Sequence, residues 1–223
     1  MERILCVIIG YLFGAIIQSG YWLCKWHGVD IRTVGSGNAG TTNVIRAMGK
    51  KIGYLTYICD MGKVLLSFLV CRALFGGNLP AIVIAMYSGL GAVLGHDYPF
   101  YLHFKGGKGI ASTTGVIISL VFIRPYFAIL IVLGFLTFIC VMYSSRYVSL
   151  ASMFLTCGFA IEFVIFALIG LVPAQGGNLA EVVIIPIVLA LLSVYQHRGN
   201  IQRLRNGSER KIRDPKKKRE NKT

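Results

Sequence analysis

Three clusters of polar residues interrupt an otherwise apolar chain, and their residue types suit the binding of phosphate. The first cluster covers 35–49 and carries glycine at positions 35, 37 and 40. Such glycines let successive backbone N–H groups turn inward as an anion-binding nest. Hydroxyl groups of Ser36, Thr41 and Thr42 add donors, and Arg46 can hold phosphate through two parallel hydrogen bonds. Taken alone, the cluster is equally consistent with a flexible loop or a helix cap.

The second cluster, 95–109, places two lysines among three glycines at the start of a predicted helix. Lys105 and Lys108 alternate with Gly106, Gly107 and Gly109. This arrangement suits phosphate, because a helix N-terminus also attracts anions. It is not a Walker A loop, since position 102 is leucine rather than glycine and position 109 is glycine rather than serine or threonine. The segment by itself is weak evidence for nucleotide binding.

The third cluster, 197–209, follows the last apolar segment. His197 and Asn200 are three residues apart, which puts both on one face of a helix. The alternative interpretation is the ordinary positive end of a last membrane span. The same spacing relates Asp60 and Lys63 inside an apolar segment, and buried charges in a membrane are usually paired. We predict a structural ion pair there rather than a direct catalytic role.

Other kinds of chemistry find little support in the sequence. There is no Gly-x-Ser-x-Gly elbow, HExxH zinc motif or Walker sequence. Six cysteines stand singly in or beside apolar runs without CxxC spacing, and we predict that they are small buried side chains. Four histidines are too scattered for a metal-ligand pattern. We therefore predict neither a metal nor an organic cofactor.

The composition excludes a soluble globular domain. Hydrophobic residues make up 55% of the 223 residues and charged residues 14%, against a usual charged share of about 25%. Mean hydropathy is +0.67. The net charge of +14 is concentrated locally, because eleven of the 23 lysines and arginines lie from Arg198 onward. The chain is predicted to be an all-α integral membrane protein with a basic tail.

Seven segments are apolar enough, or nearly long enough, to span a membrane, for which about 20 residues are needed. They are 4–24, 52–75, 79–94, 110–123, 126–143, 148–172 and 179–195. Lysine and arginine collect in cytoplasmic loops. Seven crossings, with the N-terminus outside and the C-terminus inside, put 19 of the 23 cations on the cytoplasmic side and only Arg3, Arg72 and Arg124 outside. All three polar clusters then share the cytoplasmic face.

The chain divides into a membrane domain, 1–204, and a basic tail, 205–223. The tail has no aromatic residue on which a base could stack, so we predict no nucleic-acid partner. Its cations most simply anchor the topology, and attraction to anionic lipid head groups is the sharper alternative.

Together, the three clusters resemble the three signature regions of the bacterial acyl-phosphate:glycerol-3-phosphate acyltransferases. The resemblance covers about nine-tenths of the chain, with the motifs in the right order and at the right separations. It implies a seven-helix protein of the bacterial inner membrane, with its active site on the cytoplasmic face. It further implies transfer of an acyl group from acyl phosphate to the C1 hydroxyl of glycerol 3-phosphate, giving lysophosphatidate and phosphate, the first step of phospholipid synthesis. No oligomeric state or acyl-chain preference is indicated.

The resemblance also assigns roles to residues. Segment 146–149 matches a further polar region of the family, which brings in Ser149. The predicted catalytic residues are Arg46, Lys105, His197 and Asn200. The predicted substrate-binding residues are Ser36, Gly37, Asn38, Gly40, Thr41, Thr42, Asn43, His96, Gly106, Gly107, Lys108, Gly109 and Ser149.

The chain departs from the family at three places. Residues 15–19 replace a Gly-Ser-Ile-Pro turn, Thr41 replaces a common alanine, and Val64 follows Lys63 where glycine is usual. The first departure leaves the bend of the first helix open.

Acyl phosphate is a mixed anhydride and needs no enzyme nucleophile, so direct attack by the acceptor hydroxyl is expected. The base is either His197 or an oxygen of the substrate phosphate. The rival function is a membrane transporter of an organic phosphate, which also needs cationic clusters among helices. Transporters usually bind near the membrane midplane on repeated, broken helices, whereas these clusters lie on one face and no repeat is visible.

Overall fold

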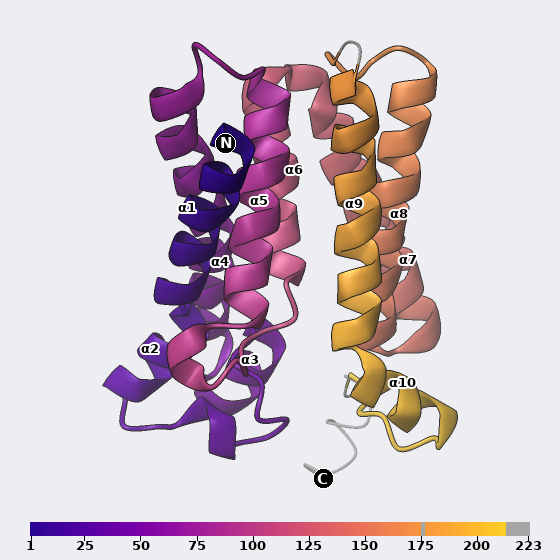
Figure 1. Ribbon diagram of the computed structural model, residues 1–223. Coiled ribbons are helices and arrows are strands. Elements are labelled where there is room, and N and C mark those ends of the chain that lie inside the picture. Colours follow the sequence, from indigo (N-terminus) through magenta and orange to yellow (C-terminus); the bar gives the residue numbers. More distant parts are fainter. Residues whose placement is uncertain (175–176, 213–223) are drawn as a thin grey trace, which may run out of the picture.

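The computed structural model describes residues 1–174 and 177–212, and every regular element in those ranges is helical. Helices α1, α4, α5 and α6 form one group, and α7, α8 and α9 form a second group beside it (Figure 1). Short helices α2, α3 and α10 lie together at one end of the bundle (Figure 1). The bounds are α1 Glu2–Ile16, α2 Ser19–Trp26, α3 Thr41–Met48, α4 Lys50–Phe75, α5 Ala81–Asp97, α6 Ile110–Ile123, α7 Ala128–Ser145, α8 Val148–Leu168, α9 Gly177–Gln196 and α10 Arg198–Arg205, with 3-10 turns at Ile31–Thr33, Phe100–Leu102 and Pro125–Phe127.

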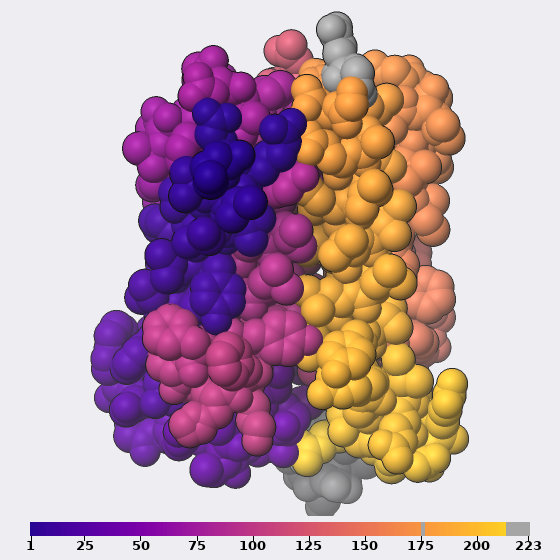
Figure 2. Space-filling model, in the orientation of Figure 1, coloured from indigo at the N-terminus to yellow at the C-terminus, as the bar shows by residue number. Residues whose placement is uncertain are grey.

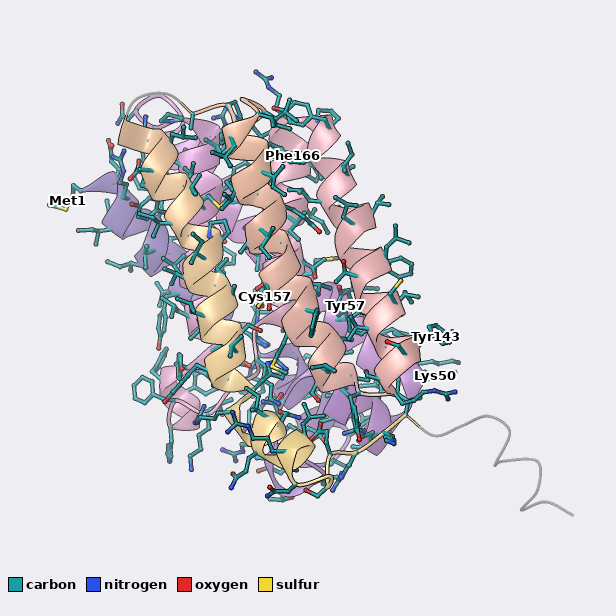
Figure 3. All side chains as sticks on the ribbon, turned by 90° about the vertical axis from the view of Figure 1, so that its right-hand side faces the viewer. Met1, Lys50, Tyr57, Tyr143, Cys157 and Phe166 are labelled. Carbon is teal, nitrogen blue, oxygen red and sulfur yellow. The ribbon has the colours of Figure 1, made fainter. Side chains whose placement is uncertain are left out.

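Helices cover each of the seven predicted segments, and the outer faces of the bundle are apolar. Four stretches have both the length and the hydropathy of a membrane span: Glu2–Trp26, Pro125–Ser145, Val148–Leu168 and Gly177–Gln196. Of the others, α4 carries three charged residues within its predicted span, α5 has 17 residues and α6 has 14. Ile129 and Phe135 of α7 are exposed, and Figure 3 shows Tyr143 of the same helix pointing away from the bundle. The all-helical membrane fold is confirmed, while the number of crossings and their orientation stay predictions.

The prediction that the six cysteines are buried is only partly correct. The expected burial of the cysteines holds for Cys6, Cys24 and Cys71, but it is wrong for Cys140, which lies on an outward face of α7. An apolar side chain that faces lipid needs no burial within the protein, so the apolar surroundings of Cys140 in the sequence did not imply that it is buried.

Residues 213–223 of the predicted tail lie outside the described residues, so the division of the chain at 204 stays a prediction.

The first predicted span is broken into two helices at Gln18. This side chain is 1% exposed, and its Nε2 donates to the carbonyl oxygens of Gly14, Gly95 and His96 at 3.0, 3.2 and 3.0 Å. The ammonium of Lys63 donates to the carbonyls of Gly14 and Ile17 at 3.2 and 2.8 Å. A helix end buried in a membrane needs such partners. Gln18 and Lys63 therefore stabilise the bend between α1 and α2.

Helices α1 and α5 pack backbone to backbone through glycines. A Cβ added at Gly10 or Gly14 of α1 would overlap the backbone of α5, and one added at Gly91 or Gly95 of α5 would overlap the backbone of α1. Each pair is spaced four residues apart, the small-residue pattern that lets membrane helices approach closely. This contact fixes the position of the α5 C-terminus, from which the second polar cluster begins.

The predicted ion pair between Asp60 and Lys63 is confirmed. Lys63 Nζ lies 2.9 Å from Asp60 Oδ1, and both residues are 1% exposed. Ser19 Oγ donates to the same carboxylate oxygen at 3.1 Å, and Nδ1 of His96 lies 2.8 Å from Lys63 Nζ. Such a buried pair is costly to break by removing one partner, because the other charge is then left unpaired. The network joins α2, α4 and α5 beneath the polar clusters.

A second polar contact joins the helices at the far end of the bundle. Arg3 Nε and Nη2 donate to the two carboxylate oxygens of Glu181 at 2.8 and 2.7 Å, and Nη2 also donates to Asn178 Oδ1 at 2.8 Å. The hydroxyl of Tyr87 donates to Glu181 at 2.8 Å. These bonds tie the start of α1 to α9 and α5.

Candidate active site

The three polar clusters meet at one end of the bundle, next to α2, α3 and α10 (Figure 1). The loop between α5 and α6 and the segment after α9 form adjoining parts of the surface there, as Figure 2 shows. Asn38 Nδ2 donates to the carbonyl of Gly106 at 3.0 Å, which joins the first cluster to the second. The ammonium of Lys108 donates to Oδ1 of Asn200, which joins the second to the third.

The first cluster is folded around the side chain of Asn43. Its Oδ1 accepts the N–H of Ser36 at 3.0 Å, and its Nδ2 donates to the carbonyl of Val34 at 2.8 Å. Asn38 acts in the same way, because its Oδ1 accepts the N–H of Gly40 at 2.9 Å. Both amides are therefore engaged with backbone and support the fold of the cluster, and their contact with substrate stays a prediction.

Three N–H groups of the first cluster, where the sequence predicts a backbone nest, are already bonded within the protein, and the nest stays a prediction. The N–H groups of Ser36 and Gly40 are held by asparagine side chains, and the N–H of Gly37 donates to the carbonyl of Val34 at 3.1 Å. Positive φ values at Gly35 and Gly37, 67° and 69°, build a tight turn. The hydroxyl of Thr41 has no partner in the described residues and is buried, so it is left available.

The second cluster is held against the C-terminus of α5. The N–H groups of Gly106 and Gly107 donate to the carbonyls of Asp97 and His96, both at 3.0 Å. A Cβ added at Gly107 would overlap the imidazole of His96, so this glycine permits the close approach. His96 itself is 3% exposed and lies beneath the loop with Lys63 on its other side. The structure places His96 as a support for the loop, and a direct contact with substrate stays a prediction.

The two lysines of this loop have different surroundings. Lys105 is exposed, without a protein partner in the described part of the chain. Lys108 is half-buried, and this burial, together with the neighbouring charge of Arg203, lowers its pKa to about 8. The charges of Arg46 and Arg198 act in the same direction, while Glu209 opposes them. Lys108 is thus the centre of a cationic group to which all three clusters contribute.

Asp97 is a residue of this site that the sequence analysis did not single out. It is 1% exposed, and the side-chain amide of Gln196 lies close enough to stabilise its carboxylate. A Cβ added at Gly109 would lie 3.2 and 3.4 Å from these two oxygens. Gly109, with φ of 71°, precedes the first residue of α6. The carboxyl group therefore lies at a helix N-terminus, but its burial outweighs the favourable charges around it and raises its pKa well above the usual value.

The third cluster folds back on itself after α10 because of Gly207. This glycine has φ of 67°, its N–H donates to Leu204, and the N–H of Ser208 donates to Arg203. These two bonds form a Schellman motif, which ends many helices at a glycine. The reversal returns Glu209 to the helix that it follows.

Glu209 is the hub of the third cluster, and it was not among the predicted site residues. Its Oε1 accepts hydrogen bonds from Asn200 Nδ2 at 2.7 Å and from Ser149 Oγ at 2.9 Å, and its Oε2 accepts from Arg203 Nε at 2.7 Å. Burial raises the pKa of Glu209, but these three hydrogen bonds outweigh it and hold the pKa below its usual value. The predicted ligand Ser149 is therefore engaged with Glu209. The sequence signal that could have identified Glu209 is Gly207, a glycine two residues before it that directly follows a basic helical segment.

His197 is buried and presents one ring nitrogen to the cluster. Its Nδ1 lies 2.8 Å from the carbonyl of Ser193, which can only accept, so Nδ1 carries the proton and Nε2 is an acceptor. Burial and the charge of Lys108 lower its pKa to about 4. The imidazole is therefore neutral near pH 7.

Arg46 lies on α3 with its charge close to the same group. Partial burial and the charge of Arg210 lower its pKa, yet a guanidinium stays protonated at any physiological pH. In the described residues, no group of three metal-ligating side chains is close enough to hold an ion. The arrangement concentrates fixed positive charge beside a neutral imidazole, which suits the binding of one or two phosphate groups.

Comparison with known proteins gives the same answer over nearly the whole chain. Residues 4–207 match the sequence profile of a family described as glycerol-3-phosphate acyltransferase. The chain is 42% identical over 208 residues to the glycerol-3-phosphate acyltransferase of Geotalea daltonii, covering 93% of this chain and 96% of the relative. It is 38% identical over 212 residues to that of Aquifex aeolicus, covering 95% of this chain and 100% of the relative.

The solved structures agree. The fold matches the crystal structure of PlsY (YgiH), an integral membrane glycerol 3-phosphate acyltransferase, in its glycerol 3-phosphate form, with a TM-score of 0.77, 36% identity and 96% of each chain covered. Its lysophosphatidic acid form gives a TM-score of 0.76 at 35% identity. The chain therefore belongs to the glycerol-3-phosphate acyltransferase family of integral membrane proteins, and it is an enzyme that transfers an acyl group to glycerol 3-phosphate.

Proposed function

We propose that the acyl donor is acyl phosphate and that the acceptor is the C1 hydroxyl of glycerol 3-phosphate, giving 1-acyl-glycerol 3-phosphate and inorganic phosphate. The observation that carries the proposal is the cationic group around Lys108, to which Arg46, Arg198 and Arg203 contribute charge. Both substrates are phosphate monoanions or dianions with reacting groups that must meet, and several fixed cations offset their repulsion. The related structures in glycerol 3-phosphate and lysophosphatidic acid forms support the acceptor and the product. The rival function of phosphate transport has no support from the family.

The residues divide between binding and proton transfer. Arg46, Lys105 and Lys108 bind the substrate phosphates, with hydroxyls of Ser36 and Thr41 as further donors. Nε2 of His197 faces the same group as an acceptor, because Nδ1 is engaged with Ser193. His197 takes the hydroxyl proton as the C1 oxygen attacks the acyl carbon, unless an oxygen of the substrate phosphate takes it. The oxygen–carbon bond to the donor phosphate then breaks, and that phosphate leaves.

Transfer is direct, without an acyl-enzyme. Thr41 and Ser36 are the hydroxyls nearest the turn of the first cluster, and neither has a hydrogen bond to a histidine or carboxylate in the described residues. A nucleophile without an adjacent base is weak. Acyl phosphate is already activated, so a covalent intermediate lowers no barrier.

The seven-span topology is part of the same proposal. With the N-terminus outside and the C-terminus inside, the active site faces the cytoplasm of a bacterial cell and the acyl chain stays in the membrane. The 19-to-3 distribution of cations supports this orientation.

The decisive experiment uses purified full-length protein with palmitoyl phosphate and glycerol 3-phosphate. Equal release of phosphate and lysophosphatidate is expected, with no transfer from palmitoyl-coenzyme A. Enzyme incubated with radiolabelled palmitoyl phosphate alone should retain no label after denaturation. Transfer from the coenzyme A thioester would overturn the donor, and label on Ser36 would overturn direct transfer.

A further inference from the structure

A recess of about 460 Å³ lies at the end of the bundle opposite the active site. It is formed where α4 ends, α5 begins and α6 ends, and Figure 1 shows these helix ends on the side away from α10. Its lining residues are Phe68, Leu69, Arg72, Ala81, Ile82, Phe122, Ile123, Arg124 and Pro173. None of them belongs to the three polar clusters, so the known activity does not account for the recess.

Two arginines line this recess without an acidic neighbour. Arg72 lies in the last turn of α4, and Arg124 directly follows α6. Both are exposed, and neither side chain has a hydrogen bond or an ion pair with the described residues. Arg3, which lies at the same end, is instead paired with Glu181. Two guanidinium groups in one recess therefore keep their donors for a group outside the protein.

The charge at this end runs against the distribution in the rest of the chain. Only three of the 23 cations are predicted on this side of the membrane, and two of those three line this one recess. A phosphate held between them would receive charge-assisted hydrogen bonds from both forks.

Apart from the two arginines, the side chains that line the recess are apolar. Phe68 and Ile82 are 4% and 1% exposed and form its inner side. Leu69 and Phe122 are 44% and 65% exposed and form its outer rim, which faces the lipid side of α4 and α6. A free phosphate ion would leave the apolar side chains of the recess in contact with water. An uncharged lipid would leave the two arginines without a negatively charged partner. The combination suits an amphiphile with an anionic head.

We propose that this recess binds one anionic phospholipid of the surrounding bilayer, with its phosphate between Arg72 and Arg124 and an acyl chain against Leu69 and Phe122. The enzyme thereby has a lipid-binding site that is separate from its active site and lies about one membrane thickness away from it. The proposal depends neither on the acyl donor nor on the direction in which the chain crosses the membrane.

The test is native mass spectrometry of the full-length protein in dodecyl maltoside, with palmitoyl-oleoyl phosphatidylglycerol or the matching phosphatidylcholine as the probe. The wild type should retain one phosphatidylglycerol more than the variant R72Q/R124Q, whose dissociation constant should rise about tenfold or more. R72K/R124K should recover part of the binding, because lysine keeps the charge but not the fork. Phe122→Ala should weaken retention without altering unfolding in lipid-free detergent, since this side chain is exposed.

The matched control is K50Q/K51Q, which removes two exposed cations from the opposite end of α4. It should retain the extra phosphatidylglycerol. Equal retention by the wild type and R72Q/R124Q would refute the site. So would equal binding of phosphatidylcholine, or thermal protection by inorganic phosphate as large as that by phosphatidylglycerol. If R72Q/R124Q does not fold, the test uses R72K/R124K and Phe122→Ala in its place. Undiminished phosphatidylglycerol binding in both of these variants would refute the site.

Discussion

Lys108 is a cation held close to other cations, and its charge therefore depends on pH in the physiological range. Its pKa is lowered to about 8, first by burial and then by Arg203. In the proposed function the cationic form of Lys108 binds phosphate, and that form is lost as the pH rises through about 8. Glu209 limits the effect, because its negative charge raises the same pKa.

The first prediction follows from this pKa. In the wild type, kcat/KM should fall as the pH rises above about 8. In Lys108→Arg the fall should move to a much higher pH, since a guanidinium keeps its proton. The measurement is a profile of kcat/KM from pH 6 to 10 with palmitoyl phosphate saturating. An unchanged basic limb in Lys108→Arg would assign the fall to another group.

Glu209→Gln is the second prediction. The amide keeps the shape but loses three charge-assisted hydrogen bonds, to Asn200, Ser149 and Arg203. Activity should fall on the order of tenfold or more. The basic limb of the pH profile should also move to lower pH, because the charge that raises the pKa of Lys108 is gone. A purely structural role would lower activity without moving the limb.

The third prediction concerns His197. Its pKa is about 4 in the folded protein and about 6.5 in an unfolded chain. A neutral histidine favoured by folding contributes stability above pH 6.5, and that contribution is lost as the pH falls toward 4. The thermal midpoint in detergent should thus fall more steeply between pH 6.5 and 4 in the wild type than in His197→Gln. Parallel curves would show that His197 is not buried in a neutral form.

At the scale of helices, the glycines between α1 and α5 set the position of the second cluster. A Cβ at Gly91 would overlap the backbone at Val7, whereas a Cβ at Gly62 of α4 meets nothing within 4 Å. The same alanine substitution therefore has opposite expected effects in the two helices.

The fourth prediction compares these two variants. Gly91→Ala should lower the thermal midpoint and reduce activity, because α1 and α5 must separate. Gly62→Ala should leave stability equal or slightly higher, since alanine favours a helix by about 1 kcal/mol over glycine. Thermal unfolding of both variants in the same detergent is the measurement. A Gly91→Ala variant as stable as the wild type would mean that the helices are not in close contact.

The sequence predicted the helical segments well, because the hydropathy of a segment follows from its own residues and needs no knowledge of the fold. It also predicted the pair Asp60 and Lys63, because i,i+3 spacing within a span leaves few other partners. It did not predict that Gln18 would stabilise the bend of the first helix, since two of its three carbonyl partners, Gly95 and His96, come from a distant part of the chain. It likewise did not reveal that the amides of Asn38 and Asn43 bond to backbone groups, because residue type does not show which groups lie nearby in the fold.

At the scale of the whole molecule, the active site is assembled from both groups of helices. Lys108 lies before α6 of the first group, whereas Asn200 and Ser149 belong to α10 and α8. The hydrogen bond from Lys108 to Asn200 joins the first group to α10, and the bond from Ser149 to Glu209 joins α8 to the segment that follows α10. A relative shift of the two groups would therefore separate the cations that bind phosphate.

The fifth prediction tests the orientation of this assembly. With Cys140 replaced by serine to remove the exposed thiol, a cysteine at Ser208 should resist an impermeant maleimide in intact spheroplasts. A cysteine at Gly77, exposed at the opposite end, should react. The reverse pattern would invert the proposed topology.

The contact between Arg3 and Glu181 has a consequence for the order of biosynthesis. Its partners are 178 positions apart, so the start of the chain waits through almost all of translation before its ion pair can form. During that time the guanidinium of Arg3 lacks its carboxylate partner, while α1 can already pack against α5 through their glycines. The ion pair between Arg3 and Glu181 can form only once α9 has packed against α1. The third polar cluster follows α9 in the chain. A nascent chain stalled before position 181 would thus hold two of its three phosphate-binding segments in place and still be inactive.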